Sequence, residues 1–158
     1  MLEQSKTVKE IKAIVFRLQN EEYGVDVQQV RSIERLEHIT RVPNAPDFVK
    51  GVINLRGVVT PVIDLRKRFG LPLTSYTDQT RIIIVRIDEI EVGLIVDAAN
   101  DVIDIPEEMI EAPPEIVGGV GAEYLRGVAK IGTRLLILLN LEKVLLMNEV
   151  EQLEQFEA

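Results

Sequence analysis

The sequence contains the same pattern of apolar residues twice, and this internal repeat restricts the possible folds more than any other feature. Residues 14–18 (Ile-Val-Phe-Arg-Leu) match residues 83–87 (Ile-Ile-Val-Arg-Ile) at an offset of 69 positions. Further segments correspond in the same order. Residues 23–25 match 92–94 at an offset of 69, 55–58 match 125–128 at an offset of 70, and after six inserted residues 62–67 match 138–143 at an offset of 76. Ordered matches of this kind rarely arise by chance, so we infer that one structural unit is used twice.

Each copy of the repeat is expected to consist mainly of β-strands. Aromatic residues make up only 4% of the chain and Trp is absent, so the core must be built from Val, Ile and Leu, and the β-branched members of this set favour strands. Gly24 and Gly93 interrupt apolar segments, which predicts a bulge or a close backbone approach at each. About five short strands per copy, with turns every 8–12 residues, predict a small barrel.

The repeat also predicts how the chain is divided. We expect an N-terminal tail at 1–12, a first barrel subdomain at 13–81, a second at 82–141 and a C-terminal helix at 142–158. The helix is expected to cover the barrel pair with an apolar stripe, or alternatively to dock a partner. Whether the first strand closes its own barrel or crosses to the other stays open, because duplicated barrels can exchange strands.

Charge and cysteine content restrict the partners and the location. The first 80 residues carry 12 basic and 10 acidic residues, whereas residues 81–158 carry 6 and 16, so their net charges are +2 and −10. An acidic half disfavours nucleic acid and anionic membranes as partners; it either solvates the surface or steers the protein towards a basic partner. The absence of Cys excludes disulfides and thiolate zinc sites and fits a reducing, cytoplasmic location. No apolar run approaches the roughly 18–20 residues of a membrane span.

The sequence contains no recognisable catalytic, cofactor or metal site. His38 is the only histidine, and the Gly-Gly-Val-Gly stretch at 118–121 lacks the Lys-Ser/Thr of a phosphate-binding loop. A series of acidic residues is better interpreted as a solvated face, because Val102 stands where a calcium-binding loop requires Gly: Asp97, Asp101, Asp104, Glu107 and Glu108. We therefore expect a non-catalytic protein without cofactors. A sensor that holds a small ligand between the barrels is the second hypothesis, and an enzyme is the third.

Arg56 is a candidate binding residue. It separates two apolar segments and precedes Gly57, and Arg126 has the same neighbours in the second copy. Arginine is common at the centres of interfaces because its planar head group makes several directed hydrogen bonds. The alternative is a structural arginine that binds nearby carbonyl groups, and both interpretations stay open.

Several motifs together resemble the CheW coupling proteins of bacterial chemotaxis. The most specific is Gly-Val-Ile-Asn-Leu-Arg-Gly, and the resemblance covers residues 13–147 through five segments: 22–26, 51–57, 61–66, 92–103 and 135–140. The regulatory domain of the CheA kinase and the CheV proteins are similar, but they carry ATP-binding segments or a receiver domain that this sequence lacks. The stand-alone coupling protein is therefore the expected type.

The resemblance implies an all-β fold of two tandem five-stranded SH3-like barrels packed together. It also implies a scaffold that joins methyl-accepting chemoreceptors to the CheA histidine kinase, without direct membrane insertion. The receptor would bind a groove between the barrels, at Val27, Val30, Arg56, Gly57, Thr80, Ile82, Gly93 and Val96. The kinase regulatory domain would contact two other surfaces, at Ile33, Val42 and Gly51 of the first barrel and at Glu111, Pro114 and Ile116 of the second.

Overall fold

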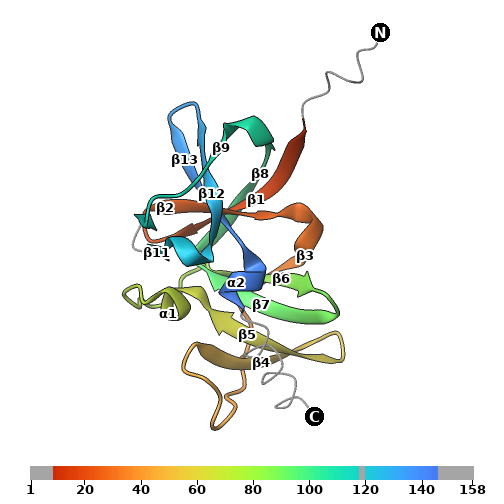
Figure 1. Cartoon of the computed structure of the whole chain (residues 1–158). Helices are drawn as coiled ribbons and strands as arrows, with labels where there is room; N and C mark the ends of the chain where they lie inside the picture. The colour runs from red at the N-terminus through yellow and green to blue at the C-terminus, as the bar shows by residue number, and fades with distance from the viewer. Residues whose placement is uncertain (1–8, 118–119, 146–158) are drawn as a thin grey trace.

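Two large β-sheets form most of the protein in a computed structural model, which describes residues 9–117 and 120–145 (Figure 1). The first part of the chain forms β1 (Glu10–Leu18), β2 (Glu21–Asp26), the short 3-10 helix η2 (Val27–Gln29), β3 (Val30–Arg35), β4 (Val49–Leu55), β5 (Val58–Asp64) and helix α1 (Leu65–Phe69). The second forms β6 (Arg81–Ile87), β7 (Ile90–Val96), β8 (Ala98–Pro106), η3 (Glu107–Met109), β9 (Ile110–Glu111), β10 (Ile116–Val117), β11 (Val120–Gly121), η4 (Ala122–Tyr124), β12 (Leu125–Ile131), β13 (Arg134–Leu139) and helix α2 (Leu141–Val144).

The two copies of the repeat exchange their first hairpins. The first barrel has the strand order β3-β6-β7-β5-β4, so the hairpin of the second copy completes it. The second barrel has the order β8-β1-β2-β13-β12-β9 and takes its hairpin from the first copy. A whole hairpin therefore crosses between the barrels in each direction. The predicted subdomains 13–81 and 82–141 consequently do not coincide with the two barrels, and the residues of the predicted C-terminal helix beyond Leu145 lie outside the described part of the chain.

The exchanged strands lie between two hydrophobic cores. Ile82 and Ile84 of β6 pack inside the first barrel, whereas Ile83 and Val85 pack in the core between the barrels. Strand β1 does the same, with Ala13 and Val15 packing in the second barrel and Ile14 and Phe16 in the shared core. Successive side chains of a strand point to opposite faces, so a strand that is covered on both faces must be apolar throughout. This explains why these segments are the best-matched parts of the repeat.

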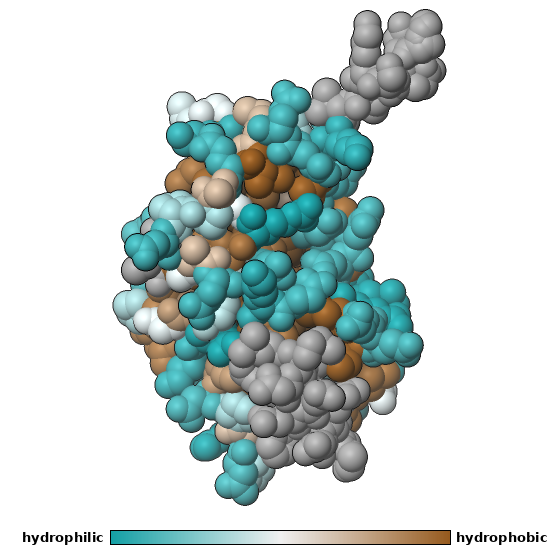
Figure 2. Space-filling view, viewed as in Figure 1, coloured by the Kyte–Doolittle hydropathy of each residue, from teal (hydrophilic) through white to brown (hydrophobic). Residues whose placement is uncertain are grey.

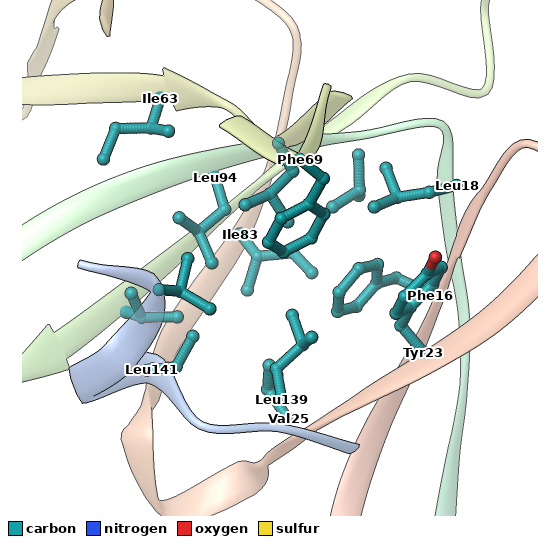
Figure 3. Close-up of a cluster of buried hydrophobic side chains, with 14 of the residues drawn as sticks. Phe16, Leu18, Tyr23, Val25, Ile63, Phe69, Ile83, Leu94, Leu139 and Leu141 are labelled. Carbon is teal, nitrogen blue, oxygen red and sulfur yellow. The ribbon is translucent and has the colours of Figure 1, made fainter. Parts of the chain in front are cut away.

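The core between the barrels is densely filled with apolar side chains from both halves of the chain (Figure 3). Four of the seven aromatic residues form a continuous series within it or at its edge. The ring centroids of Phe16 and Tyr23 are 5.7 Å apart, those of Tyr23 and Phe69 6.4 Å, and those of Phe69 and Tyr124 5.3 Å. Side chains thus occupy the region where the ligand-sensor hypothesis placed a small molecule.

Strand pairing shows that the six inserted residues come earlier than the sequence alignment suggests. Val62 pairs with Gly93 and Leu138 with Gly24, which makes hairpin β4–β5 equivalent to β12–β13 at an offset of 76 throughout. Gly51 therefore corresponds to Gly127 and not to Gly121.

The two Leu-Arg-Gly segments differ in conformation. Arg56-Gly57 forms the turn between β4 and β5, whereas Arg126 and Gly127 lie inside β12. Their alignment at an offset of 70 is a local sequence match without structural equivalence. The interpretation that Arg126 occupies the same place as Arg56 is therefore wrong.

We expect Tyr23→Phe to weaken the alkaline sensitivity of the protein. The Tyr23 hydroxyl is buried without a hydrogen-bond partner among the described residues. Burial, with a smaller contribution from Glu21, raises the pKa of Tyr23 to about 12. Because the folded-state pKa exceeds the ordinary value of about 10, this contribution to stability is complete below pH 10 and is lost as the pH rises towards 12. Urea unfolding from pH 7 to pH 11 should show a shallower alkaline decline for the variant, with stability at pH 7 unchanged or up to about 1 kcal/mol higher. Identical pH profiles would contradict this expectation.

Candidate partner-binding surfaces

Three of the five acidic residues singled out in the sequence, Asp97, Asp101 and Asp104, form ion pairs between elements. The Arg66 Nε–Asp97 Oδ1 distance is 2.9 Å, the Arg134 Nη1–Asp101 Oδ2 distance 3.4 Å and the Lys12 Nζ–Asp104 Oδ1 distance 3.7 Å. Across residues 9–117 and 120–145, no three His, Cys, Asp or Glu side chains gather in a way that could hold a metal ion. Ion pairs between elements therefore account for three of these residues.

One of these ion pairs fastens the two barrels to each other. Arg66 follows β5 of the first barrel, and its hydrogen bonds to Asp97 raise the pKa of the guanidinium above its ordinary value. Asp97 connects β7 to β8, where the chain passes from the first barrel to the second, and also accepts a hydrogen bond of 2.8 Å from the Gln19 backbone N–H in the β1–β2 turn. The relative position of the barrels is thus fixed by directed bonds as well as by apolar packing.

Arg56 is displayed to solvent by the tight turn between β4 and β5. Its φ is +51° and that of Gly57 is +89°, and the Asn54 side chain stabilises the turn by accepting a hydrogen bond of 2.8 Å from the Gly57 N–H. The Arg56 side chain is 72% exposed, with Nη1 at 3.7 Å from the Glu34 Oε2 atom. This exposure favours an interface arginine over one that is held by backbone carbonyls.

Arg56 and Val30 border the same surface pocket of about 250 Å³, which also includes Arg31, Ser32, Leu55, Ile84 and Glu91. Val30 is half-buried and packs partly against the core between the barrels. The pocket therefore combines an exposed cation with an apolar wall, and its lining residues come from β3, β4, β6 and β7. Two of the predicted receptor-binding residues are brought together here.

Four other predicted receptor-binding residues are buried. Thr80, Ile82 and Val96 are 4%, 0% and 1% exposed, and Gly93 is buried against Ile82, whose Cγ2 atom would lie 2.7 Å from a Cβ at that position. Their side chains have no surface to offer a partner in this state. Val27 is half-buried and packs against the core between the barrels, so the accessible part of the predicted site consists of Val30, Arg56, Gly57 and part of Val27.

Several predicted kinase-binding residues lie in or beside equivalent strand pairings of the two barrels, and we call these two places the barrel ends. Thr40 pairs with Val52 in an isolated bridge, and Glu111 of β9 pairs with Val128 of β12. Because Val52 and Val128 are equivalent in the repeat, Thr40 and Glu111 are equivalent too.

The individual side chains of this set differ in exposure. Ile33 is 42% exposed, Val42 is half-buried and Gly51 is buried beneath the Thr40 backbone. Glu111 and Pro114 are exposed, and Ile116 begins β10. Among the members whose side chains are described, Ile33, Glu111 and Pro114 are therefore the most accessible, whereas Gly51 is buried beneath the surface.

Sequence reasoning missed an apolar surface beside the Arg56 turn. Val58 and Val59 at the start of β5 are 58% and 44% exposed, and with Thr60, Arg86 and Ile90 they border a pocket of about 290 Å³. In the sequence, the adjacent Val58 and Val59 break the apolar–polar alternation of a half-buried strand, and this break was the available signal. On the face drawn in Figure 2 hydrophilic residues predominate and hydrophobic surface occurs in separate patches. Contiguous exposed apolar patches are candidate contact surfaces, whereas single exposed apolar residues are normal.

Comparisons with known proteins agree with this architecture. The family model described as a CheW-like domain matches residues 12–149. The chemotaxis protein CheW of Bacillus subtilis is 50% identical over 134 residues, covering 85% of this chain and 86% of that protein. The chemotaxis protein CheW of Klebsiella aerogenes is 42% identical over 137 residues, covering 87% and 82%. The crystal structure of the scaffolding protein TtCheW from Thermoanaerobacter tengcongensis superposes with a TM-score of 0.81 at 38% identity, covering 90% and 92% of the two chains. The predicted fold of two SH3-like barrels is confirmed.

Proposed function

Because the chain belongs to the CheW-like family and acts as a scaffold adaptor of chemotaxis, we propose that it couples methyl-accepting chemoreceptors to the CheA histidine kinase. In this proposal the protein catalyses no reaction and needs no cofactor. Its contribution is to hold the receptor and the kinase regulatory domain at different surfaces of one body.

The exposed turn at Arg56 is the observation that carries the receptor part of the proposal. A helical receptor tip would place apolar side chains on Val30 and Val27 and acidic or carbonyl groups on Arg56, because helices dock by inserting apolar anchors into a groove. Gly57 leaves open space beside the turn, since no atom lies within 4 Å of a Cβ built there. Thr80, Ile82, Gly93 and Val96 would support this surface from inside the first barrel and from the core beneath it.

The kinase part of the proposal uses the two equivalent barrel ends. The first barrel would contact the kinase regulatory domain near Ile33, Val42 and Gly51, and the second near Glu111, Pro114 and Ile116. The exposed Ile33 supplies an apolar anchor, whereas the second surface is acidic and lies in the acidic half of the chain. The two ends therefore differ in chemistry although they are equivalent in the repeat, so each would select its own contact.

The proposed location is the cytoplasm, at membrane receptor arrays that the protein reaches through its partners. The cysteine-free sequence fits that compartment. As a separate observation, no helix within the described ranges is both long enough and apolar enough to cross a bilayer.

We expect Arg56→Ala to weaken binding to a receptor cytoplasmic fragment about tenfold, because truncating an interface arginine typically costs 1–2 kcal/mol. The free energy of unfolding should change by less than about 0.5 kcal/mol, because the side chain is exposed. Calorimetric titration with the receptor fragment and with the kinase regulatory domain measures both affinities, and the second should not change.

Arg126→Ala is the matched control for this experiment. Arg126 also follows a leucine and precedes a glycine, but it lies inside β12 with its Nη1 3.8 Å from the Asp26 Oδ2 atom. Its replacement should leave receptor affinity unchanged. Equal losses for both variants, or unfolding of the Arg56 variant, would overturn the receptor site. Failure of the unaltered protein to bind either partner would overturn the proposed function.

A further inference from the structure

A basic pocket of about 320 Å³ opens on the first barrel, away from Arg56 and Val30. Three cations line it: Arg41 from the loop before β4, Lys50 from β4 and Lys67 from α1. Phe48 and the 57% exposed Leu73 add apolar surface. The volume falls in the range of pockets that hold small ligands or peptide side chains.

Two carboxylates also border this pocket, and both oxygens of one of them are already hydrogen-bonded within the protein. Asp64 accepts hydrogen bonds from the Arg66 backbone N–H at 3.0 Å and from the Tyr76 hydroxyl at 3.0 Å. Asp47 is exposed at the rim. The three cations thus outnumber the acidic groups, and Lys50 is further positioned by the Tyr76 ring, whose centroid is 5.4 Å from Nζ.

The chain after α2 begins next to this pocket. Arg68 donates a hydrogen bond of 2.8 Å from Nε to the Val144 carbonyl, and its guanidinium lies 4.6 Å from the centroid of the Phe48 ring. Phe48 is a wall of the pocket. Leu145, which follows Val144, is 1% exposed. The last described residues before this segment therefore lie one side chain, that of Arg68, away from Phe48 of the pocket.

The sequence that follows has the complementary chemistry. Residues 149–157 contain four glutamates, at 149, 151, 154 and 157, and no Lys or Arg. Leu153 and Phe156 stand between these glutamates. A pocket of cations around apolar surface selects an acidic segment with apolar anchors, through Coulomb attraction at close range and burial of apolar area.

We propose that the basic pocket of Arg41, Lys50 and Lys67 binds the acidic segment 149–157 of the same chain. The pocket adjoins Val42 and Gly51 in sequence, so the bound segment would compete with the kinase regulatory domain for the first barrel. This last consequence rests on the proposed function, whereas the binding of the segment does not.

Cysteine cross-linking in the full-length protein tests the contact, because the native chain contains no Cys. The pair Leu73→Cys and Gln155→Cys should form an intramolecular disulfide at least about tenfold faster than the pair Val102→Cys and Gln155→Cys, because docking raises the effective concentration of the two thiols. Val102 is a matched control, since it is 51% exposed but lies on β8 of the other barrel.

Charge dependence completes the test. Adding Lys50→Glu or Lys67→Glu to the Leu73→Cys/Gln155→Cys protein should lower its rate of disulfide formation to nearly that of the control pair. Raising the salt to 1 M, where the screening length is about 3 Å, should have the same effect. Equal rates of disulfide formation for the two pairs would overturn the proposal. A fast rate that neither the glutamate substitutions nor high salt lowers would overturn it as well. Disulfide-linked dimers in place of the monomer would also overturn it and assign the pocket to a second copy.

The competition is measured separately with the charge-neutral variant Glu151→Gln/Glu154→Gln. It should bind the kinase regulatory domain several-fold more tightly than the native chain. An unchanged affinity alongside positive cross-linking would refute the competition and leave the contact established, whereas no kinase binding by either protein would refute the proposed function.

Discussion

Gly51→Ala is expected to destabilise the protein by about 3 kcal/mol or more, a loss typical of severe steric strain. A Cβ at Gly51 would lie 2.2 Å from the Thr40 carbonyl oxygen and 2.8 Å from the Ile39 Cγ2 atom, and the backbone φ is +155°. The obstacle is backbone and not a flexible side-chain end. Thr40 exchanges two hydrogen bonds of 2.8 Å with Val52, so relief of the clash must break this bridge and detach the segment that carries Val42.

Urea unfolding of Gly51→Ala, compared with Gly132→Ala, measures the effect. Gly132 has a φ of +61° but nothing within 4 Å of its Cβ position, so its replacement should cost only the backbone strain, about 1 kcal/mol. Gly127→Ala should resemble Gly51→Ala, since its Cβ would lie 2.7 Å from the Glu111 carbonyl oxygen at the equivalent bulge. A loss at Gly51 no larger than that at Gly132 would show that the Thr40 segment yields easily and does not hold the first barrel end in place.

Separating the chain at the middle of the repeat is expected to abolish folding of both parts. Fragment 1–81 would contain β3, β4 and β5 without β6 and β7, which stand between β3 and β5 in the first barrel. It would also contain β1 and β2 without β8 and β13, and an isolated hairpin is marginally stable at best. Fragment 82–158 would lack β1 and β2, which stand between β8 and β13 in the second barrel, and would contain β6 and β7 without β3, β4 and β5. Each fragment should give an unfolded circular dichroism spectrum, and mixing them should restore the strand signal in a one-to-one complex.

A fragment cut at the barrel boundary provides the contrast. Residues 27–97 include all five strands of the first barrel, so this piece should retain strand structure alone. It should also self-associate, because the faces of β6 and β7 that pack in the shared core would be exposed. Independent folding of both 1–81 and 82–158 would contradict the exchange of hairpins.

The sequence was informative wherever a single local rule decides the structure. The apolar runs around Ile14 and Ile83 predicted strands, which the structure confirms. The prediction of a bulge or a close backbone approach at Gly24 and Gly93 was wrong, because side-chain atoms of Leu138 and Ile82 fill the space at their Cβ positions. The exchange of hairpins could not be derived in the same way. Both copies present nearly identical apolar strands, so periodicity alone cannot tell which barrel each hairpin completes.

The candidate site was less predictable than the fold. Arg56 is exposed because it lies in a two-residue turn between β4 and β5. The same Leu-Arg-Gly motif at Arg126 lies inside β12 and forms no turn. The burial of Thr80, Ile82 and Val96 depends on tertiary packing of strands that are covered on both faces. These three residues were assigned to the receptor site by resemblance to a family. Such a resemblance does not tell whether a side chain contacts the partner or only supports a neighbouring side chain that does.

The chain passes between the barrels at two short connections, which limit how far the barrels can move relative to each other. One crossing is the single turn η2 between β2 and β3, and the other is Asp97 alone between β7 and β8. The filled core and the Arg66–Asp97 bond resist rotation of the barrels around these connections. If the proposed kinase contacts form at the two barrel ends, the bound groups would be kept at one separation and one angle. On the proposed function, such a body would set the spacing between its partners, and rotation of one barrel would be passed to the other as rotation of the whole body.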